Sequence, residues 1–428
     1  MDTLKRISVD QLTPGMFVVK LDRPWLKTPF LFHKRMIKES EEIALLKRHG
    51  IREVVIDLAK SEAHAPAHAS ESGQGGASHL SEEPFGHCTQ TTPDPLSTAE
   101  PVRLPTASQM RAARQVYTDA QTVMDRLFDD ADSGIAPAGS SLSSVVAGVL
   151  TRILDDRTSM LMHLYLRQMR RYDQTLSSHA IDVCALSLLF AVESGLTPED
   201  QETVGLGALL HDLGYLRLPR NLFRKGIRCT EQERALLNRH PSLGAAMLAD
   251  AKDFRDDARQ VIREHHERLN GSGFPLGLAG SQISPLSQLV GVADTYLSLI
   301  APRDGRAPLI LNEAIKRLFI LGKKGEFAME LVEVAVKSLG VYPIGSLVEL
   351  NTGQRGVVVA LNPLQRLRPV LALVSDPPSD AGREPRVLDL SDTHASGPSP
   401  SIARCLDPQQ HGVDVAMYLE ACHNHAES

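Results

Sequence analysis

The fold of this chain is decided by the stretch Ala208-Leu209-Leu210-His211-Asp212-Leu213-Gly214. It places a histidine and an aspartate side by side at the end of a strongly apolar helical run. Burying an imidazole and a carboxylate is costly unless the two groups are paired or bind a metal ion. The stretch therefore predicts a helical core that carries a polar site.

Further histidines and a second aspartate occur in apolar helical surroundings on both sides of this stretch. They are His179, His240, the pair His265-His266, and Asp294. A single buried histidine is more often an ordinary core residue than a ligand, so His179 or His240 alone would indicate little. Five histidines and two aspartates together are enough to hold two metal ions.

The spacing of these residues fits two ions lying side by side. Neighbouring residues on an α-helix point about 100° apart. Each of the pairs His211-Asp212 and His265-His266 can therefore place one side chain at each ion. Asp212 has two carboxylate oxygens and can bridge them. Mixed imidazole and carboxylate ligation suits Fe, Mn or Zn better than Ca or Mg. We therefore expect two divalent transition-metal ions, Fe or Mn first and Zn as the alternative.

The composition excludes several other classes of protein. The chain has 428 residues, a formal net charge of −6, 42% hydrophobic and 23% charged residues. This charge argues against a nucleic-acid polymer as the partner. No apolar run is long enough to predict a membrane span, and the N-terminus does not resemble a signal peptide. Five scattered cysteines without C-x-x-C spacing indicate reduced thiols in a cytoplasm.

Local sequence patterns divide the chain into segments. Residues 1–60 predict a small α/β domain, with two strands, Met16–Val19 and Val54–Ile56, on either side of a charged helix at residues 38–49. Residues 61–108 have almost no large apolar side chain, which predicts a disordered linker. Connecting helices follow at 109–149, and the helical domain spans 150–345. A small β segment is expected at 346–376, followed by a C-terminal tail at 377–428.

The order of the polar residues resembles the HD-GYP family of bacterial cyclic di-GMP phosphodiesterases, a helical variant of the HD hydrolase fold. The resemblance covers about 190 residues. It rests on His179, His211-Asp212, His240, His265-His266-Glu267, Asn270-Gly271-Ser272-Gly273-Phe274-Pro275 and Asp294, with support from Pro219, Lys225-Gly226, Thr230, Glu233, Pro241 and Gly277. Residues 1–60 are similar to the small domain that often precedes this catalytic domain. The resemblance implies a mainly α fold, with a helical HD-type metal-hydrolase domain, a small N-terminal α/β domain and a short C-terminal β segment.

The resemblance also implies a role for each ligand candidate. His179, His211, Asp212 and Asp294 would hold one metal ion, and Asp212, His240, His265 and His266 the other. His211 and Asp212 would form the catalytic centre, where the metal pair makes a water molecule acidic and clamps the phosphate. Arg303 and Arg306 match family positions that contact ligand phosphates, with an ordinary solvated loop as the alternative. Gly273, Phe274 and Pro275 would also contact the substrate.

Three positions depart from the family pattern. Tyr215 stands where His-Asp-x-Gly-Lys has a lysine that can contact substrate phosphate, which predicts slow turnover. Phe274 replaces the tyrosine of Gly-Tyr-Pro, so one hydroxyl is lost and the aromatic ring is kept. Thr175 stands where some members have a glutamate for a third metal ion, so we expect two ions.

Three functions remain open at this stage. The first is hydrolysis of cyclic di-GMP to linear pGpG, to GMP or to both, in bacterial second-messenger signalling. The second is a catalytically weak receptor for cyclic di-GMP or a partner protein on the same scaffold. The third is an HD-type hydrolase of another nucleotide, which the loop from Gly271 to Pro275 disfavours. Signalling proteins are possible partners of residues 1–60, and the sequence does not fix the oligomeric state.

Overall fold

The computed structural model divides the chain into two compact units, Met1–Val102 and Arg103–Ser428. It describes residues 4–21, 35–37, 43, 46–47, 51–58, 61, 104–135, 137, 139–170, 175–219, 222, 229–251, 254–301, 307–374, 385–392 and 400–424. Most of the expected linker, residues 62–103, lies outside these ranges. The last expected linker residues do not: Thr106 caps a helix that begins at Ala107.

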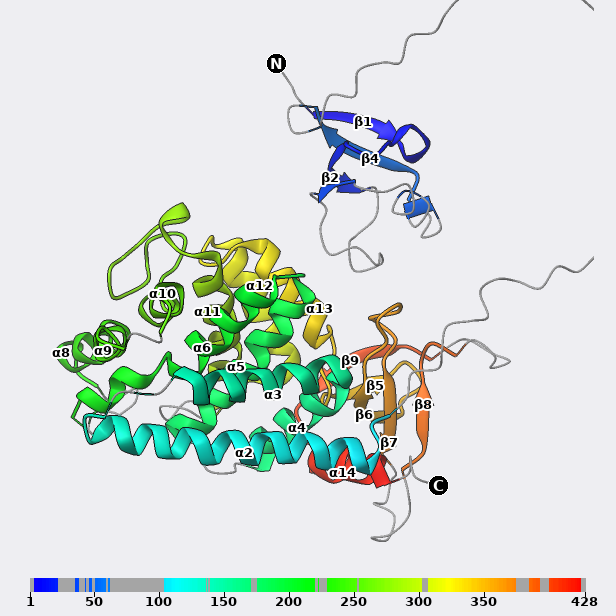
Figure 1. The fold of residues 1–428 in the computed structure, drawn as a ribbon. Coiled ribbons are helices and arrows are strands. Elements are labelled where there is room, and N and C mark those ends of the chain that lie inside the picture. Colours follow the sequence, from blue (N-terminus) through cyan, green and yellow to red (C-terminus); the bar gives the residue numbers. More distant parts are fainter. Residues whose placement is uncertain are drawn as a thin grey trace, which may run out of the picture. The chain divides into compact units, whose positions relative to one another are not determined.

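The first unit is built on an antiparallel sheet with the strand order β1-β4-β2-β3 (Figure 1). Its strands are β1 (Leu4–Ser8), β2 (Phe17–Leu21), β3 (Arg35–Met36) and β4 (Glu53–Asp57), with a short 3-10 helix, η1 (Val9–Gln11), after β1. The two expected strands correspond to β2 and β4, and the sequence prediction missed β1 and β3. The alternating burial of β4 places Val54 and Ile56 in the core. The helix expected at 38–49 falls mostly outside the described residues.

The second unit is dominated by helices. They are α2 (Ala107–Asp132), α3 (Gly139–Asp155), α4 (Arg157–Arg170), α5 (Leu176–Glu193), α6 (Pro198–Leu210), η3 (Leu213–Arg217), α8 (Glu231–Leu237), α9 (His240–Met247), α10 (Asp256–Glu264), η5 (Gly280–Gln282), α11 (Pro285–Ile300), α12 (Leu311–Lys323) and α13 (Met329–Leu339). Helix α5 packs against α6, α11 and α3, and α10 packs against α6 and α9. The mainly α fold that the sequence predicts is confirmed.

Local capping signals position the helices that carry the polar residues. Thr175 and Thr197 are the N-caps of α5 and α6, and each hydroxyl accepts a hydrogen bond from a backbone N–H of the first turn. Pro198 and Pro285 stand in the first turns of α6 and α11, where a missing backbone N–H costs nothing. These signals fix where the apolar helices begin and therefore which of their residues reach the centre of the bundle.

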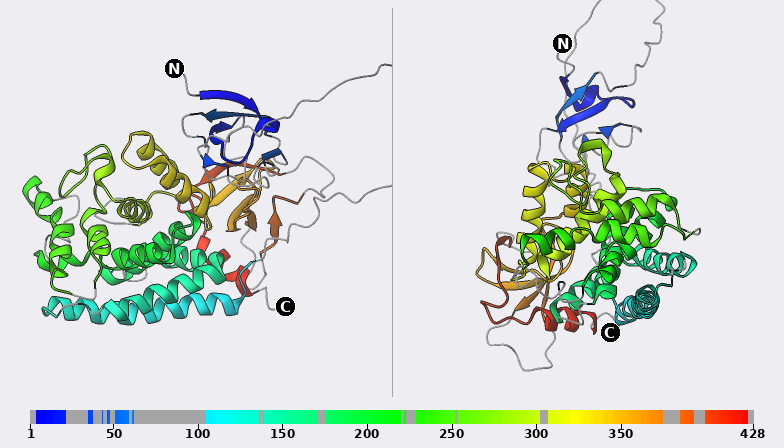
Figure 2. Two further views of the ribbon diagram at one scale, coloured as in Figure 1. Left: turned by 45° about the horizontal axis from the view of Figure 1, so that its top comes forward. Right: turned by 90° about the vertical axis from the view of Figure 1, so that its left-hand side faces the viewer.

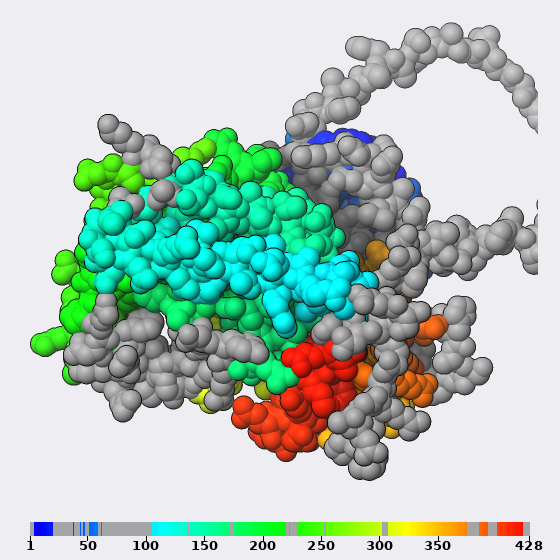
Figure 3. Space-filling model, turned by 60° about the horizontal axis from the view of Figure 1, so that its bottom comes forward, coloured from blue at the N-terminus to red at the C-terminus, as the bar shows by residue number. Residues whose placement is uncertain are grey.

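A five-stranded antiparallel sheet lies at one end of the helical bundle (Figures 1 and 2). Its order is β8-β7-β6-β5-β9. The strands are β5 (Leu347–Leu350), β6 (Arg355–Ala360), β7 (Val370–Val374), β8 (Val387–Asp389) and β9 (Ile402–Leu406), and α14 (Val415–Asn424) follows. Helix α14 contacts α4 and α2, and Figure 3 shows it beside the end of α2 on the surface.

The sequence prediction of a plain C-terminal tail at 377–428 is wrong. Strand β9 pairs with β5, with Leu406 opposite Leu347 and Cys405 opposite Val348. Leu390 is buried in the core of this sheet. The reason is that the sequence of β9 shows little alternation of apolar and polar residues. Its strand structure depends on pairing with β5, more than fifty residues earlier. Such a long-range pairing leaves no local signal in the sequence.

Among the described residues, α5 is the one helix long and apolar enough to pass a test for a membrane span. However, 83% of its apolar window is buried inside the fold, and it carries His179 and Asp182 in the interior. These are the properties of a core helix.

Candidate metal centre

The structure brings all seven candidate ligands together in the middle of the helical bundle. They form two adjoining groups within which the ligand atoms lie within 4.8 Å of one another. One group is His179, His211 and Asp294; the other is Asp212, His240, His265 and His266. We call the two groups together the metal centre. Each group gathers side chains from helices far apart in the sequence.

Asp212 lies between the two groups. Its Oδ2 is 3.3 Å from His211 Nε2 and 3.9 Å from His179 Nε2. Its Oδ1 is 3.4 Å from His240 Nε2. One carboxylate therefore presents a different oxygen to each group, the arrangement expected of a bridging ligand.

Asp294 completes the first group from α11. Its Oδ1 lies 3.0 Å from His179 Nε2 and 4.0 Å from His211 Nε2. Its Oδ2 lies 3.9 Å from His266 Nδ1. Asp294 therefore approaches both groups, although it is closest to His179.

The backbone orients three of the imidazoles. His211, His240 and His265 each donate Nδ1–H to the carbonyl oxygen three residues earlier, at 2.7, 2.9 and 2.8 Å. A carbonyl can only accept, so Nδ1 carries the hydrogen and the Nε2 lone pair faces the metal centre. Metal-binding histidines are commonly fixed through their other ring nitrogen in this way.

The inward-facing nitrogens are not satisfied by the protein itself. His240 Nε2 and His265 Nε2 face each other at 3.3 Å with their lone pairs directed into the same space. The buried His211 Nε2 has no hydrogen-bond partner among the described residues. Buried acceptors without donors are costly, and a shared cation would satisfy them. The residues present therefore fit a metal site.

Electrostatics act differently on the ligand candidates. Burial would lower the pKa of His211, but the nearby carboxylates of Asp212 and Asp294 raise it above its usual value. Burial, reinforced by His211 and His240, lowers the pKa of His265 to about 3, so its ring is neutral. Burial alone would raise the pKa of Asp294, but its hydrogen bond to His179 and the nearby imidazoles hold that pKa well below its usual range. Asp294 is therefore ionised while His265 stays neutral.

The centre opens towards the solvent at His266. Its side chain is 18% exposed, against 0% for His211 and 1% for His240. The ring of Phe274 lies beside it, with centroids 4.5 Å apart. A ligand would therefore reach the metal centre past His266 and Phe274.

Close backbone contacts support this arrangement at two glycines. A Cβ at Gly214 would lie 1.9 Å from the carbonyl oxygen of His240, so only glycine lets η3, which follows α6, approach α9. A Cβ at Gly273 would lie 2.4 Å from Glu267 Cα. Gly273 therefore allows the loop that carries Phe274 and Pro275, both half-buried, to fold back onto the residues after His266.

The substituted Tyr215 does not occupy the position of a free phosphate contact. Its ring is stacked on that of His240, with centroids 4.1 Å apart and planes inclined by 12°. The tyrosine thus packs against a ligand candidate. Arg303 and Arg306, the two predicted phosphate contacts, lie outside the described residues.

Two supporting residues were not assigned roles from the sequence. Both carboxylate oxygens of Glu267 accept backbone hydrogen bonds, from Leu276 at 2.7 Å and Leu278 at 2.9 Å. The guanidinium of Arg268 donates to the carbonyl oxygen of His265 at 3.2 Å and to Thr295 Oγ1 at 3.2 Å. The only signal in the sequence is their place directly after His265-His266.

Comparisons with known proteins agree with this geometry. A family described as "HD domain" matches residues 149–324, which include all seven candidate ligands. A domain of unknown function, DUF3391, matches residues 4–140. A cyclic di-GMP phosphodiesterase of Pseudomonas aeruginosa is 29% identical over 90% of this chain and 89% of its own length.

Two further relatives match over shorter stretches. A cyclic di-GMP phosphodiesterase response regulator of Xanthomonas campestris is 31% identical over 31% of this chain and 35% of its own length. A 3′3′-cGAMP-specific phosphodiesterase of Vibrio cholerae is 29% identical over 41% of this chain and 40% of its own length. This chain therefore spans well under half the length of these two relatives.

Proposed function

The chain belongs to the HD-domain proteins, and from this membership we propose that residues 150–345 form a two-metal phosphodiesterase that hydrolyses cyclic di-GMP. The observation that carries the proposal is the position of Asp212, whose two oxygens face two separate groups of ligand candidates. A site for one ion would need one group only. The match along 90% of the chain to a cyclic di-GMP phosphodiesterase supports the choice of substrate.

His179, His211, Asp212 and Asp294 would hold one ion, and Asp212, His240, His265 and His266 the other. When bound, two divalent ions supply an acidic water molecule and a clamp for the phosphate. The protein's own part is to keep the imidazole of His265 neutral, as its low pKa does, and to orient the Nε2 atoms of His211, His240 and His265 inward. Fe or Mn fits this donor set best, with Zn as the alternative.

The substrate would enter where His266 is exposed. The aromatic face of Phe274 beside His266 offers an apolar surface to a guanine base, and Gly273 and Pro275 shape the same loop. Arg303 and Arg306 would contact the phosphates. Cleavage of one ester gives linear pGpG, and cleavage of the second gives GMP.

A second candidate function rests on Tyr215. Its ring is stacked on His240, so it offers no positive charge to a phosphate where a lysine would. This observation favours a slow enzyme or a receptor that binds cyclic di-GMP and transmits its presence. The similarity to a 3′3′-cGAMP-specific enzyme makes that dinucleotide the appropriate competing substrate.

We place the activity in the cytoplasm, with the sheet of residues 4–57 as the input for signalling proteins. The four cysteines among the described residues, Cys184, Cys229, Cys405 and Cys422, are free thiols. This agrees with a reducing compartment.

One experiment separates these functions. Purified protein reconstituted with Mn or Fe is incubated with cyclic di-GMP or 3′3′-cGAMP, and the products are separated by chromatography. We expect slow release of pGpG or GMP from cyclic di-GMP, and elemental analysis approaching two ions per chain. Full metal occupancy and nucleotide binding without any product would establish the receptor. A metal content near zero after reconstitution would overturn both.

A further inference from the structure

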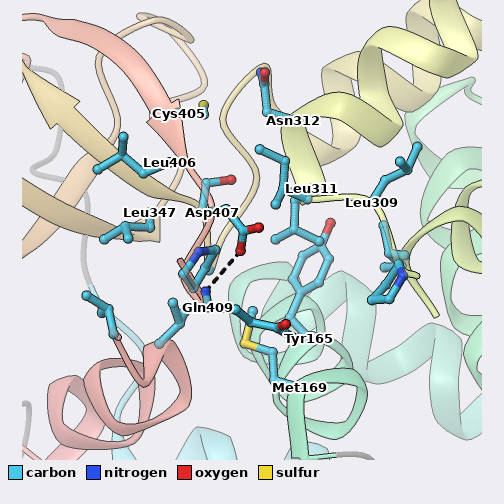
Figure 4. Close-up of a pocket in the computed structure, with 18 of the residues that line it drawn as sticks. Tyr165, Met169, Leu309, Leu311, Asn312, Leu347, Cys405, Leu406, Asp407 and Gln409 are labelled. Carbon is cyan, nitrogen blue, oxygen red and sulfur yellow. Dashed lines mark hydrogen bonds between the residues drawn. The ribbon is translucent and has the colours of Figure 1, made fainter. Parts of the chain in front are cut away.

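A second cavity, of about 340 Å³, lies between α4, the segment leading into α12, the strands β5 and β9, and the start of α14 (Figure 4). None of the seven candidate metal ligands lines it. Its volume is within the range of small-molecule sites, roughly 300–1,000 Å³. It lies between the helical bundle and the C-terminal sheet, a place where such sites are common.

The cavity presents hydrogen-bond acceptors that have no donor. Ser346, only 6% exposed, lines it with a buried hydroxyl that has no partner among the described residues. Gln168 lines it as well, and its buried Oε1 also lacks a partner. Exchanging the oxygen and nitrogen of the Gln168 amide would not give Oε1 a hydrogen-bond partner, because Nε2 already donates to Asp182 Oδ2 at 2.8 Å.

Two donors of the cavity wall are already engaged. The hydroxyl of Tyr165 shares a hydrogen bond of 2.8 Å with that of Tyr296. Asn312 Nδ2 donates to the carbonyl oxygen of Val341 at 2.8 Å. The wall therefore has acceptors to offer a ligand and few donors.

Two carboxylates add negative charge. Asp407 and Asp414 line the cavity, and no Lys, Arg or His is among the described residues that do so. Asp407 Oδ1 accepts a hydrogen bond from the backbone N–H of Gln409 at 2.9 Å. Asp407 Oδ2 accepts a second hydrogen bond, from Gln410 Nε2 at 3.0 Å. A carboxylate has about four acceptor positions, so Asp407 can accept more. A ligand that matches this wall carries hydrogen-bond donors and a positive charge.

The rest of the wall is apolar. Figure 4 shows Met169, Leu309, Leu311, Leu347 and Leu406 around the same space. We propose that this cavity binds a small organic amine, whose ammonium group donates to Ser346, Gln168 and Asp407 and whose apolar body packs against these side chains. Water alone could satisfy the polar atoms, but it would leave the apolar wall hydrated.

The test uses three probes that share one apolar body: 2-phenylethylamine, the neutral 2-phenylethanol and the anionic 3-phenylpropionate. Binding to the full-length protein is measured by calorimetry and by saturation-transfer NMR. We expect the amine to bind at least about tenfold more tightly than the other two, because a hydrogen bond to a charged group contributes more than one between neutral groups. Equal binding of the three probes, or no binding of the amine at millimolar concentration, would overturn the proposal.

Variants locate the site. Ser346→Val replaces the hydroxyl with two methyl groups, and we expect it to weaken amine binding about tenfold or more. Ser338→Val is the matched control, because Ser338 is also buried with a hydroxyl that lacks a partner, yet lies on α13 outside the cavity. Unchanged affinity in Ser346→Val, or an equal loss in Ser338→Val, would contradict the assignment.

A charge variant makes the test independent of packing at Ser346. We expect Asp407→Asn to weaken binding of the amine and to leave 2-phenylethanol unaffected. Asp389→Asn is its control, since Asp389 accepts a similar backbone hydrogen bond from Ser391 at 2.8 Å outside the cavity. None of these measurements depends on phosphodiesterase activity.

Discussion

Helix α5 carries a buried histidine, His179, and a buried aspartate, Asp182, about one turn apart, and their surroundings differ. His179 points into the metal centre, where Asp294 Oδ1 is 3.0 Å away. Asp182 points to another group, the Asp182 cluster, formed with Arg167, Gln168 and Tyr117. There Asp182 Oδ1 lies 3.5 Å from Arg167 Nε, and the Arg167 guanidinium lies 5.1 Å from the centroid of the Tyr117 ring.

The difference lies in where the positive charge comes from. The Asp182 cluster contains its own cation, Arg167, which opposes the effect of burial on the carboxylate but does not cancel it. The metal centre gathers inward-facing lone pairs, such as the Nε2 atoms of His240 and His265, and its buried His211 Nε2 has no partner among the described residues. Buried polar residues that pack around a cation of the protein therefore form a structural network, whereas buried lone pairs that converge without such a cation indicate a ligand site.

The strongest test of this comparison removes one carboxylate from each group. We expect Asp212→Asn to lower the hydrolysis rate by more than the roughly 10–100-fold that loss of an outer partner of a metal ligand causes, and to lower metal occupancy, because both ions lose a ligand. Asp182→Asn should keep the metal content and most of the rate. Product chromatography measures the rate and elemental analysis measures the metal content. Similar losses of both in the two variants would contradict the distinction between the metal centre and the Asp182 cluster.

A smaller effect is expected at Tyr215. Charge-assisted hydrogen bonds are about twice as strong as neutral ones, so Tyr215→Lys should raise the hydrolysis rate about ten- to a hundredfold. The metal content should stay constant, although the lysine gives up the stacking on His240. Tyr215→Phe is the control that keeps the ring, and its rate should stay close to that of the natural protein. A fast natural protein that gains nothing from lysine would mean that another cation already contacts the phosphate.

The Asp182 cluster should be visible in the pH dependence of stability. Burial, opposed by Arg167, raises the pKa of Asp182 to about 7. The folded state therefore holds a proton that the unfolded state has lost, and this group's contribution to stability falls as pH rises from about 4 to about 7.

The effect amounts to about 1.4 kcal/mol for each unit by which the pKa is raised. Denaturant unfolding of the parent and of Asp182→Asn across this range measures it. The variant should gain stability relative to the parent as pH rises, and a constant difference between the two would show that Asp182 is ionised throughout.

The smallest expected effect concerns Thr175, where some relatives have a metal-binding glutamate. Its hydroxyl accepts a hydrogen bond from the Ser178 backbone N–H at 3.1 Å and caps α5. Thr175→Ala should reduce the free energy of unfolding by about 1 kcal/mol, the usual cost of losing an N-cap, and Thr175→Ser should not. A drop in metal content in Thr175→Ala without a loss of stability would instead make Thr175 part of the metal centre.

Much of the helical fold and of the candidate site could be predicted from local sequence. The structure brings together the seven ligand candidates because each is a costly polar residue on an apolar helix, and that cost is visible in a single chain. The C-terminal sheet could not be predicted in full, since β9 depends on its pairing with β5. The supporting roles of Glu267 and Arg268 depend on which backbone groups come near them.

Local sequence alone shows that polar groups would be buried and which residues they are, because hydrophobic periodicity fixes the helices and their buried faces. It could not separate His179 from Asp182, which stand on the same apolar helix. The packing of the helices places Asp182 beside Arg167 and His179 beside Asp294. The physical reason is that charge balance is a property of neighbours in space. The packing of α4 and α11 against α5, and not the sequence of α5, supplies those neighbours.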